Sequence, residues 1–138
     1  MSTRCHIAFY ENRAQDFDSP TTLLYRHSDG YPDGPHGVLA TLLPMLRTFQ
    51  ERRGLDDIEY AAAWVLWSQI NAHVEWVKGF AAEMGTDNTS TPMDGIDCLG
   101  YGICSGHGFH GDHEYIYAVY PDGLDVHDRS GVIQSFPL

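Results

Sequence analysis

The chain has 138 residues, which is enough for one domain with a hydrophobic core and too few for two, so we expect a single domain over residues 1–138. Hydrophobic residues make up 43% of the chain and aromatic residues 12%, with glycine and proline distributed throughout, which excludes extended disorder. The formal net charge of -11 disfavours duplex nucleic acid and anionic membranes as partners, and every apolar stretch is shorter than the roughly 20 residues of a membrane-spanning helix.

The first two predicted elements are strands. Cys5, Ile7 and Phe9 alternate with polar or small residues in "RCHIAFYEN", which is the period of a half-buried strand. The β-branched and aromatic segment "TTLLYRH", residues 21–27, predicts a second strand that pairs antiparallel with the first and ends at the turn residues "SDGYPDG".

A first helix is predicted from Pro35 or Gly37 to a stop at Gly54, with Pro44 either kinking it or marking its true start. A longer helix follows, with Asp56 or Asp57 as its N-cap and Gly85 as its end.

The first half of the second helix is apolar nearly all round. We therefore expect it to lie between two packed layers, or between the sheet and another subunit. In either arrangement Trp64 and Trp67 are expected to belong to the core.

The C-terminal part predicts strands again. Residues 96–104 form a weak, glycine-broken strand, and residues 113–120, 124–128 and 132–136 form a meander joined by tight turns. Strands, two helices and more strands predict an α+β fold, in which the helices cover a mainly antiparallel sheet.

One candidate site is rich in metal-binding side chains, which are Cys98, Cys104, His107, His110 and His113. All are of zinc-ligand type, but their spacing matches no standard zinc motif. The interpretations are a zinc site, a hydrolase using these histidines, or a histidine-rich loop with no cofactor, and we expect the last. Since the chain lacks phosphate-binding and nucleophile motifs, we expect a protein that is not an enzyme.

A second candidate site combines scarce basic residues with aromatic ones. Guanidinium groups bind phosphate, and aromatic faces stack on bases, so the combination is typical of a site for a planar anion. The residues expected to bind such a ligand are Arg4, Arg26, His27, Tyr31, Trp76, Phe80 and Arg129.

The segments "RCHI" and "LYRHSDGYPDG" resemble a pattern of small phage and prophage proteins, in which an R-C-x-I strand precedes a Y-R-H-x-D-G-Y-P turn. The resemblance covers about the first quarter of the chain, and Ser28 stands where those proteins often have an aromatic residue.

The size, the α+β order and the arginine and aromatic set also resemble the Thoeris anti-defence type of phage sponge proteins. Those are oligomers that sequester cyclic ADP-ribose isomers or cyclic oligonucleotides without catalysis. The resemblance implies a phage-encoded homo-oligomer in the host cytoplasm, with Arg26, His27 and Arg129 on phosphates and Trp76 or Phe80 on adenine.

Two other functions stay open at this point. One is a metal-dependent hydrolase or phosphodiesterase that uses residues 98–114. The other is an acidic inhibitor of a host defence complex, of the anti-CRISPR kind, whose charge imitates nucleic acid. The acidic residues are spread from Glu11 to Asp128, which weakens the second idea.

Overall fold

The computed structural model describes residues 2–83, 85, 100–104 and 108–138, except for the side chains of residues 80 and 81. It contains one six-stranded sheet with the order β3-β2-β1-β4-β5-β6. The strands are β1 (Cys5–Phe9), β2 (Thr22–Arg26), β3 (Tyr101–Ile103), β4 (Tyr115–Tyr120), β5 (Gly123–Asp128) and β6 (Gly131–Pro137). Only β1 and β4, the central pair, run parallel, and the other four pairings are antiparallel.

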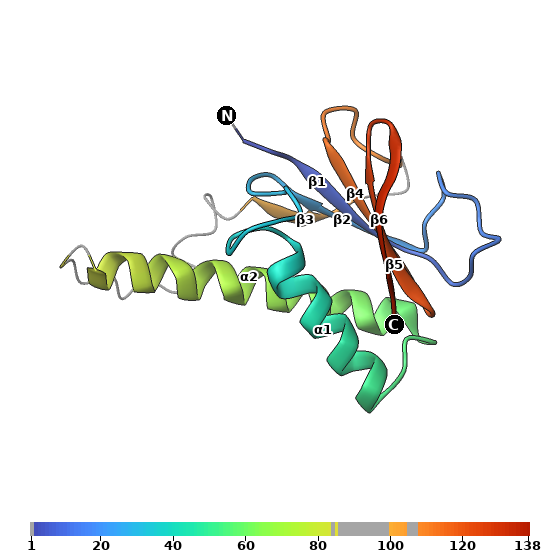
Figure 1. Cartoon of the computed structure of the whole chain (residues 1–138), viewed down its shortest axis with the longest axis horizontal. Helices are drawn as coiled ribbons and strands as arrows, with labels where there is room; N and C mark the ends of the chain where they lie inside the picture. The colour runs from blue at the N-terminus through green and yellow to red at the C-terminus, as the bar shows by residue number, and fades with distance from the viewer. Residues whose placement is uncertain (1, 84, 86–99, 105–107) are drawn as a thin grey trace.

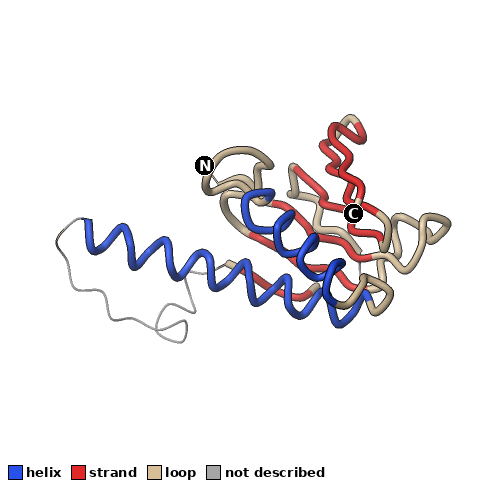
Figure 2. Tube along the Cα trace, turned by 60° about the horizontal axis from the view of Figure 1, so that its bottom comes forward, coloured by secondary structure: helices blue, strands red, loops and turns tan. Residues whose placement is uncertain are grey.

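Two helices, α1 (Leu39–Arg52) and α2 (Ile58–Glu83), lie across one face of the sheet (Figures 1 and 2). Gly54, two residues after Arg52, terminates the α1 helix, and its φ of 85° is a left-handed conformation that glycine adopts without strain. The α2 helix begins after Asp57, whose carboxylate accepts a hydrogen bond from the Tyr60 amide at 3.2 Å. It continues beyond the sheet edge in Figure 1.

The sheet has a hydrophobic cluster on each face. The helix face combines Ile7, Leu24 and Tyr117 with α1 and α2 side chains such as Leu42 and Val65. The opposite face, which we call the far face, combines buried strand residues with Phe17, Cys104 and Phe109 from the connecting segments. Because side chains alternate along a strand, neighbouring residues of one strand belong to different clusters.

The predicted α+β class, the N-terminal strand pair, the C-terminal meander and the longer second helix are confirmed. The core assignment of Trp64 and Trp67 is wrong, because these side chains are 44% and 54% exposed. Since α2 is apolar nearly all round, its periodicity does not identify which side faces the core. Within the described residues, no helix combines the length and apolar character needed to cross a membrane.

Candidate anion-binding pocket

The turn after β2 is built by close backbone approach. Gly30 donates to the Thr3 oxygen at 2.9 Å, and its own oxygen accepts from the buried Tyr117 hydroxyl at 2.7 Å. A Cβ atom at Gly30 would lie 2.8 Å from that Thr3 oxygen and 2.9 Å from the Cβ atom of Cys5, so only glycine fits here. The turn therefore passes tightly over the start of β1 and leads to α1.

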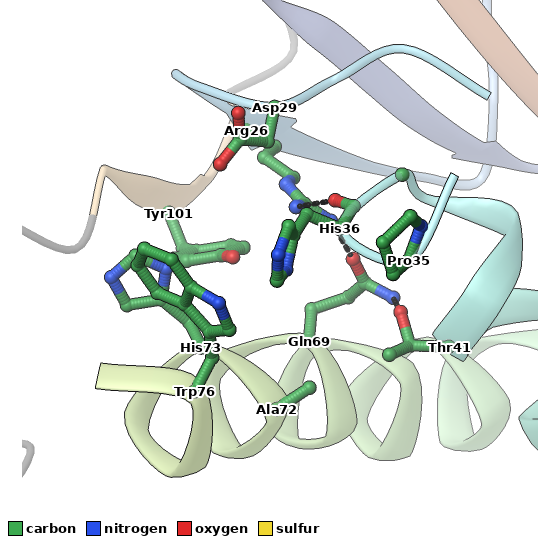
Figure 3. Close-up of a pocket in the computed structure, with 11 residues that line it drawn as sticks. Arg26, Asp29, Pro35, His36, Thr41, Gln69, Ala72, His73, Trp76 and Tyr101 are labelled. Carbon is green, nitrogen blue, oxygen red and sulfur yellow. Dashed lines mark hydrogen bonds between the residues drawn. The ribbon is translucent and has the colours of Figure 1, made fainter. Parts of the chain in front are cut away.

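This turn wraps around the Arg26 side chain. Arg26 is only 8% exposed, and its guanidinium donates to the Ser28 oxygen at 2.9 Å and the His36 oxygen at 3.1 Å. A third donor reaches Oε1 of Gln69 on α2 at 2.6 Å, while Nε2 of Gln69 donates to the Thr41 hydroxyl at 2.6 Å (Figure 3). The chain of hydrogen bonds thus holds the guanidinium between the sheet and both helices.

Among the described residues, the guanidinium of Arg26 donates hydrogen bonds only to uncharged acceptors. No carboxylate oxygen in that part of the chain lies within 4.0 Å of its nitrogens. A guanidinium has five N–H donors, and the three bonds above leave two of them for another acceptor. Because a buried charge without a counterion is costly, this arrangement favours binding of an anion.

A pocket of about 140 Å³ opens beside the guanidinium. Its walls come from the turn after β2, from α2 and from β3, and Figure 3 shows Tyr101, His73 and Trp76 grouped at one side of it. The Trp76 ring is 45% exposed and meets the His36 ring edge-on, with 4.9 Å between their centroids. The Arg26 guanidinium lies 5.6 Å from the centre of the Tyr101 ring.

Burial, followed by the nearby charge of Arg26, lowers the pKa of His73, so its imidazole is neutral at neutral pH. Burial raises the pKa of Tyr101, which keeps its phenol protonated. Among the described residues that line the pocket, Asp29 is the acidic one. Its backbone has a φ of 54°. The pocket therefore offers a cation, two aromatic faces, the imidazoles of His36 and His73, and one carboxylate.

Two of the residues predicted from the sequence, Arg26 and Trp76, meet in this pocket. His27 and Arg4 do not join them, because they meet on the far face, where Nε of Arg4 donates to Nδ1 of His27 at 3.3 Å. Arg4 is also ion-paired there with Asp112 at 2.7 Å. Arg26 and His27 are consecutive, so the alternation of strand side chains directs them to opposite faces.

The other predicted ligand residues lie elsewhere or are not described. Arg129 is an exposed residue of the β5–β6 turn and lines a separate, open depression with Glu114 and Asp128. Tyr31 lies in the turn after β2, where its backbone oxygen accepts from the Val38 amide at 2.9 Å, and it is not among the pocket residues. The side chain of Phe80 lies outside the described residues.

Three of the proposed metal ligands, Cys104, His110 and His113, lie next to a residue that the sequence analysis did not select, His6. This buried ring has its Nδ1 3.1 Å from the Leu24 oxygen and 3.8 Å from Sγ of Cys104, and its Nε2 accepts from the His110 amide at 2.9 Å. The ring of His113 lies 5.2 Å away. The Nε2 atom of His6 thus attaches the segment around residue 110 to the sheet, while its Nδ1 atom faces the Leu24 oxygen of β2.

Among the described residues, no group of three histidine, cysteine or acidic side chains is arranged to hold a metal ion. Cys98 and His107, the two remaining members of the predicted set, lie outside those residues. Cys104 and Cys5 are free thiols.

The sequence analysis also missed Gln69, His73, His36 and Tyr101 as pocket residues. Gln69 lies on the same side of α2 as buried Val65, but the sequence did not show which side of this helix faces the core. Comparisons of this chain with family models, with curated proteins and with solved structures found no match.

Proposed function

We propose that this protein binds a small nucleotide-type anion in the pocket beside Arg26 and sequesters it without catalysis. The observation that supports the proposal best is the buried Arg26 guanidinium, which has spare donors, neutral acceptors only among the described residues, and an open cavity beside it. Its fixed, planar fork suits a phosphate better than a flexible ammonium group would.

The other walls of the pocket fit the remaining parts of a nucleotide. Trp76 and Tyr101 offer aromatic faces against which a base can stack. Asp29 repels a second phosphate, and it is suited to accept hydrogen bonds from sugar hydroxyls. The combination favours one phosphate attached to a sugar and a base over a polyphosphate.

The volume of the pocket limits how the ligand sits. At about 140 Å³ it is smaller than the 300 Å³ or more of most small-molecule sites. We therefore place the phosphate inside, next to Arg26, and the base at the rim against the half-exposed ring of Trp76. A cyclic nucleotide bound in this way remains partly exposed to solvent.

The role that we propose for this binding is the one implied by the resemblance to phage sponges: removal of a cyclic nucleotide or cyclic ADP-ribose signal made by a host defence system. Sequestration needs tight binding and no chemical change. A neutral imidazole such as His73 can hydrogen-bond the ligand without transferring a proton.

Isothermal titration of the full chain with cyclic mononucleotides, cyclic dinucleotides and cyclic ADP-ribose isomers tests the proposal. We expect one ligand class to bind, Trp76→Ala to weaken it roughly tenfold through lost stacking, and Arg26→Lys to weaken it further through lost bidentate contact. Trp76 is half-exposed and Arg26→Lys retains the charge, so both variants are expected to fold, as circular dichroism would verify.

Arg129→Ala is the matched control, because it removes an arginine that lies outside the pocket. It should bind as the unmodified protein does. Ligand released by heating should have its original mass. Equal affinity in the Trp76 and Arg26 variants would overturn the site, and a cleaved ligand would identify an enzyme instead.

A further inference from the structure

Gln69 on α2 differs from the other hydrogen-bond acceptors of Arg26 among the described residues. Ser28 and His36 accept through backbone oxygens, whose charge no substitution can change. Gln69 accepts through its side chain, which is 2% exposed and has its Oε1 2.6 Å from Nη1 of Arg26. The amino acid at this position therefore sets whether the buried arginine has a counterion within the protein.

The orientation of the Gln69 amide follows from its two partners. A guanidinium has donors only, so the amide oxygen faces Arg26, and the amide nitrogen donates to the Thr41 hydroxyl at 2.6 Å. That hydroxyl donates in turn to the Val38 oxygen at 3.3 Å. Each group thus donates to the next, from the pocket to the first turn of α1, and Figure 3 shows Gln69 between Arg26 and Thr41.

A glutamate side chain would fit the same place. One of its oxygens would accept from Arg26, and the other would accept from the Thr41 hydroxyl, which can rotate to donate. The Val38 oxygen would keep the Leu42 amide as its donor, at 2.9 Å. Hydrogen-bond geometry therefore does not require an amide here. The difference between glutamine and glutamate is one negative charge, which would make a buried ion pair with Arg26.

We propose that Gln69 makes this pocket selective for anions, because its amide holds the Arg26 guanidinium in place without neutralising it. The inference rests on the proposed function, since it concerns the same pocket. It names the ligand group that Gln69 selects, which is an oxyanion such as a phosphate rather than a neutral sugar or base. Gln69 acts through Arg26 and is therefore a positioning residue.

The other titratable groups of the pocket leave Arg26 as its source of positive charge. Arg26 is the only arginine or lysine among the described residues that line the pocket. Burial, followed by the charge of Arg26, lowers the pKa of His73, so this imidazole adds no charge at neutral pH. Asp29 lines the pocket with the opposite charge. A second carboxylate, at position 69, would cancel what attracts an anion.

The neutral amide also links anion binding to stability. A buried cation without a counterion destabilises the free protein, and a bound anion supplies the missing charge. We therefore expect inorganic phosphate to raise the unfolding temperature of the unmodified chain. A carboxylate at position 69 would provide the counterion permanently, so phosphate would no longer have this effect.

Isothermal titration of the full chain with inorganic phosphate tests the inference, because this probe has the charge of the ligand without its sugar or base. Gln69→Glu should weaken phosphate binding at least roughly tenfold, since the introduced carboxylate occupies the guanidinium. In phosphate-free buffer the same variant should unfold at a temperature no lower than that of the unmodified chain. A purely structural role of Gln69 would not combine lost binding with retained stability.

Gln69→Met separates the charge of this side chain from its hydrogen bond. The methionine has a similar length, removes the amide contact to Arg26 and adds no charge. If Gln69 only held the guanidinium in place, Gln69→Met would bind phosphate more weakly than Gln69→Glu. The proposed charge effect predicts the opposite order, and the order that a structural role gives would overturn the inference.

Asp29→Asn tests the same charge balance without changing position 69. Asparagine tolerates the φ of 54° at this residue, so the variant is expected to fold. It removes the carboxylate that lines the pocket, and phosphate should bind roughly twofold more tightly or better. Unchanged or weaker phosphate binding in Asp29→Asn would overturn the inference even if Gln69→Glu did not fold.

Val132→Glu is the control for net charge, because it adds the same negative charge at a 54% exposed site on β6, outside the pocket. It should bind phosphate as the unmodified chain does. Equal phosphate affinity in Gln69→Glu and the unmodified chain, or no phosphate binding by the unmodified chain, would overturn the inference. If Gln69→Glu lost phosphate binding but the unmodified chain bound no nucleotide, the inference would stand and the proposed function would fail.

Discussion

Two buried polar side chains of the strands, His6 and Arg26, lie on opposite faces of the sheet and are accommodated differently. On the far face, both ring nitrogens of His6 have hydrogen-bond partners, and aromatic rings surround the imidazole. On the helix face, the buried guanidinium of Arg26 has three acceptors among residues 2–83, 85, 100–104 and 108–138, which leaves two of its donors, and it borders a cavity. Burial alone therefore does not indicate a functional residue.

The difference lies in unused hydrogen-bonding capacity next to open space. A buried polar group whose partners are complete stabilises the fold, as His6 does by attaching residue 110 to the sheet. A buried cation with spare donors gains from a ligand. Three changes test this distinction, and we take them from the largest expected effect to the smallest.

Gly30→Val should have the largest effect on stability. Its side chain would overlap the backbone of Thr3 and the Cβ atom of Cys5, and neither can move without displacing β1. We expect a loss of roughly 3 kcal/mol or more in the free energy of unfolding, measured by urea denaturation, and a loss of ligand binding with the turn that carries Asp29 and His36.

Gly111→Ala on the far face is the control, because a Cβ atom there meets nothing within 4 Å. Its unfolding midpoint should match that of the unmodified chain. A Gly30 variant as stable as the unmodified chain would show that Gly30 does not lie this close to Thr3 and Cys5.

The second largest effect is expected from acid, which should destabilise the far face through His6. The pKa of His6 is lowered from 6.5 to about 4, and burial is the largest cause. The hydrogen bond to the Leu24 oxygen opposes burial, the charges of His113 and His110 lower the pKa as well, and Asp112 has the smallest effect, which raises it. The unfolded chain therefore binds more protons than the folded chain between these pH values. The stabilisation is complete above about pH 6.5 and is lost as the pH falls through 4.

After allowance for solvent screening, we expect this loss to be on the order of 2 kcal/mol between pH 7 and pH 4. His6→Asn should reduce the pH dependence of the free energy of unfolding. Burial also lowers the pKa values of His73 and His127, so His73→Asn serves as the comparison from the helix face. An unchanged pH profile in the His6 variant would show that another histidine is responsible.

Arg4→Ala should have the smallest effect. Its ion pair with Asp112 joins side chains that are 36% and 47% exposed, and such surface pairs contribute about 0.5 kcal/mol. Ligand affinity should not change, because Arg4 lies on the far face. Weaker binding in this variant would mean that the ligand contacts the face opposite the pocket.

Local patterns were sufficient to predict much of the fold. The alternation in β1, the turn residues of the meander and the glycine stops after both helices are signals carried by neighbouring residues, and each gave the right element. The parallel pairing of β1 with β4 was not predicted, because it joins distant segments. The outward side of α2 was missed because apolar residues occupy its whole circumference.

The candidate site was predicted only in part. Arg26 and Trp76 were selected by residue type, but their meeting depends on Gln69 and His36, which come from two other parts of the chain. The alternation of side chains along a strand is enough to predict that Arg26 and His27 lie on opposite faces of the sheet. By contrast, only the tertiary structure shows that His6 and His110 share a hydrogen bond.

The pairing of Cys5 with Tyr115 at the centre of the sheet affects how the protein can be made. A growing chain can form the β1–β2 pair, and later the meander of β4, β5 and β6, from contacts between near neighbours, but β1 can meet β4 only after about 110 further residues have been made. Joining segments so far apart slows folding. During that interval the apolar side chains of β1 and β2 have no completed sheet to join, so a newly made chain is most exposed to aggregation just before its last strands emerge.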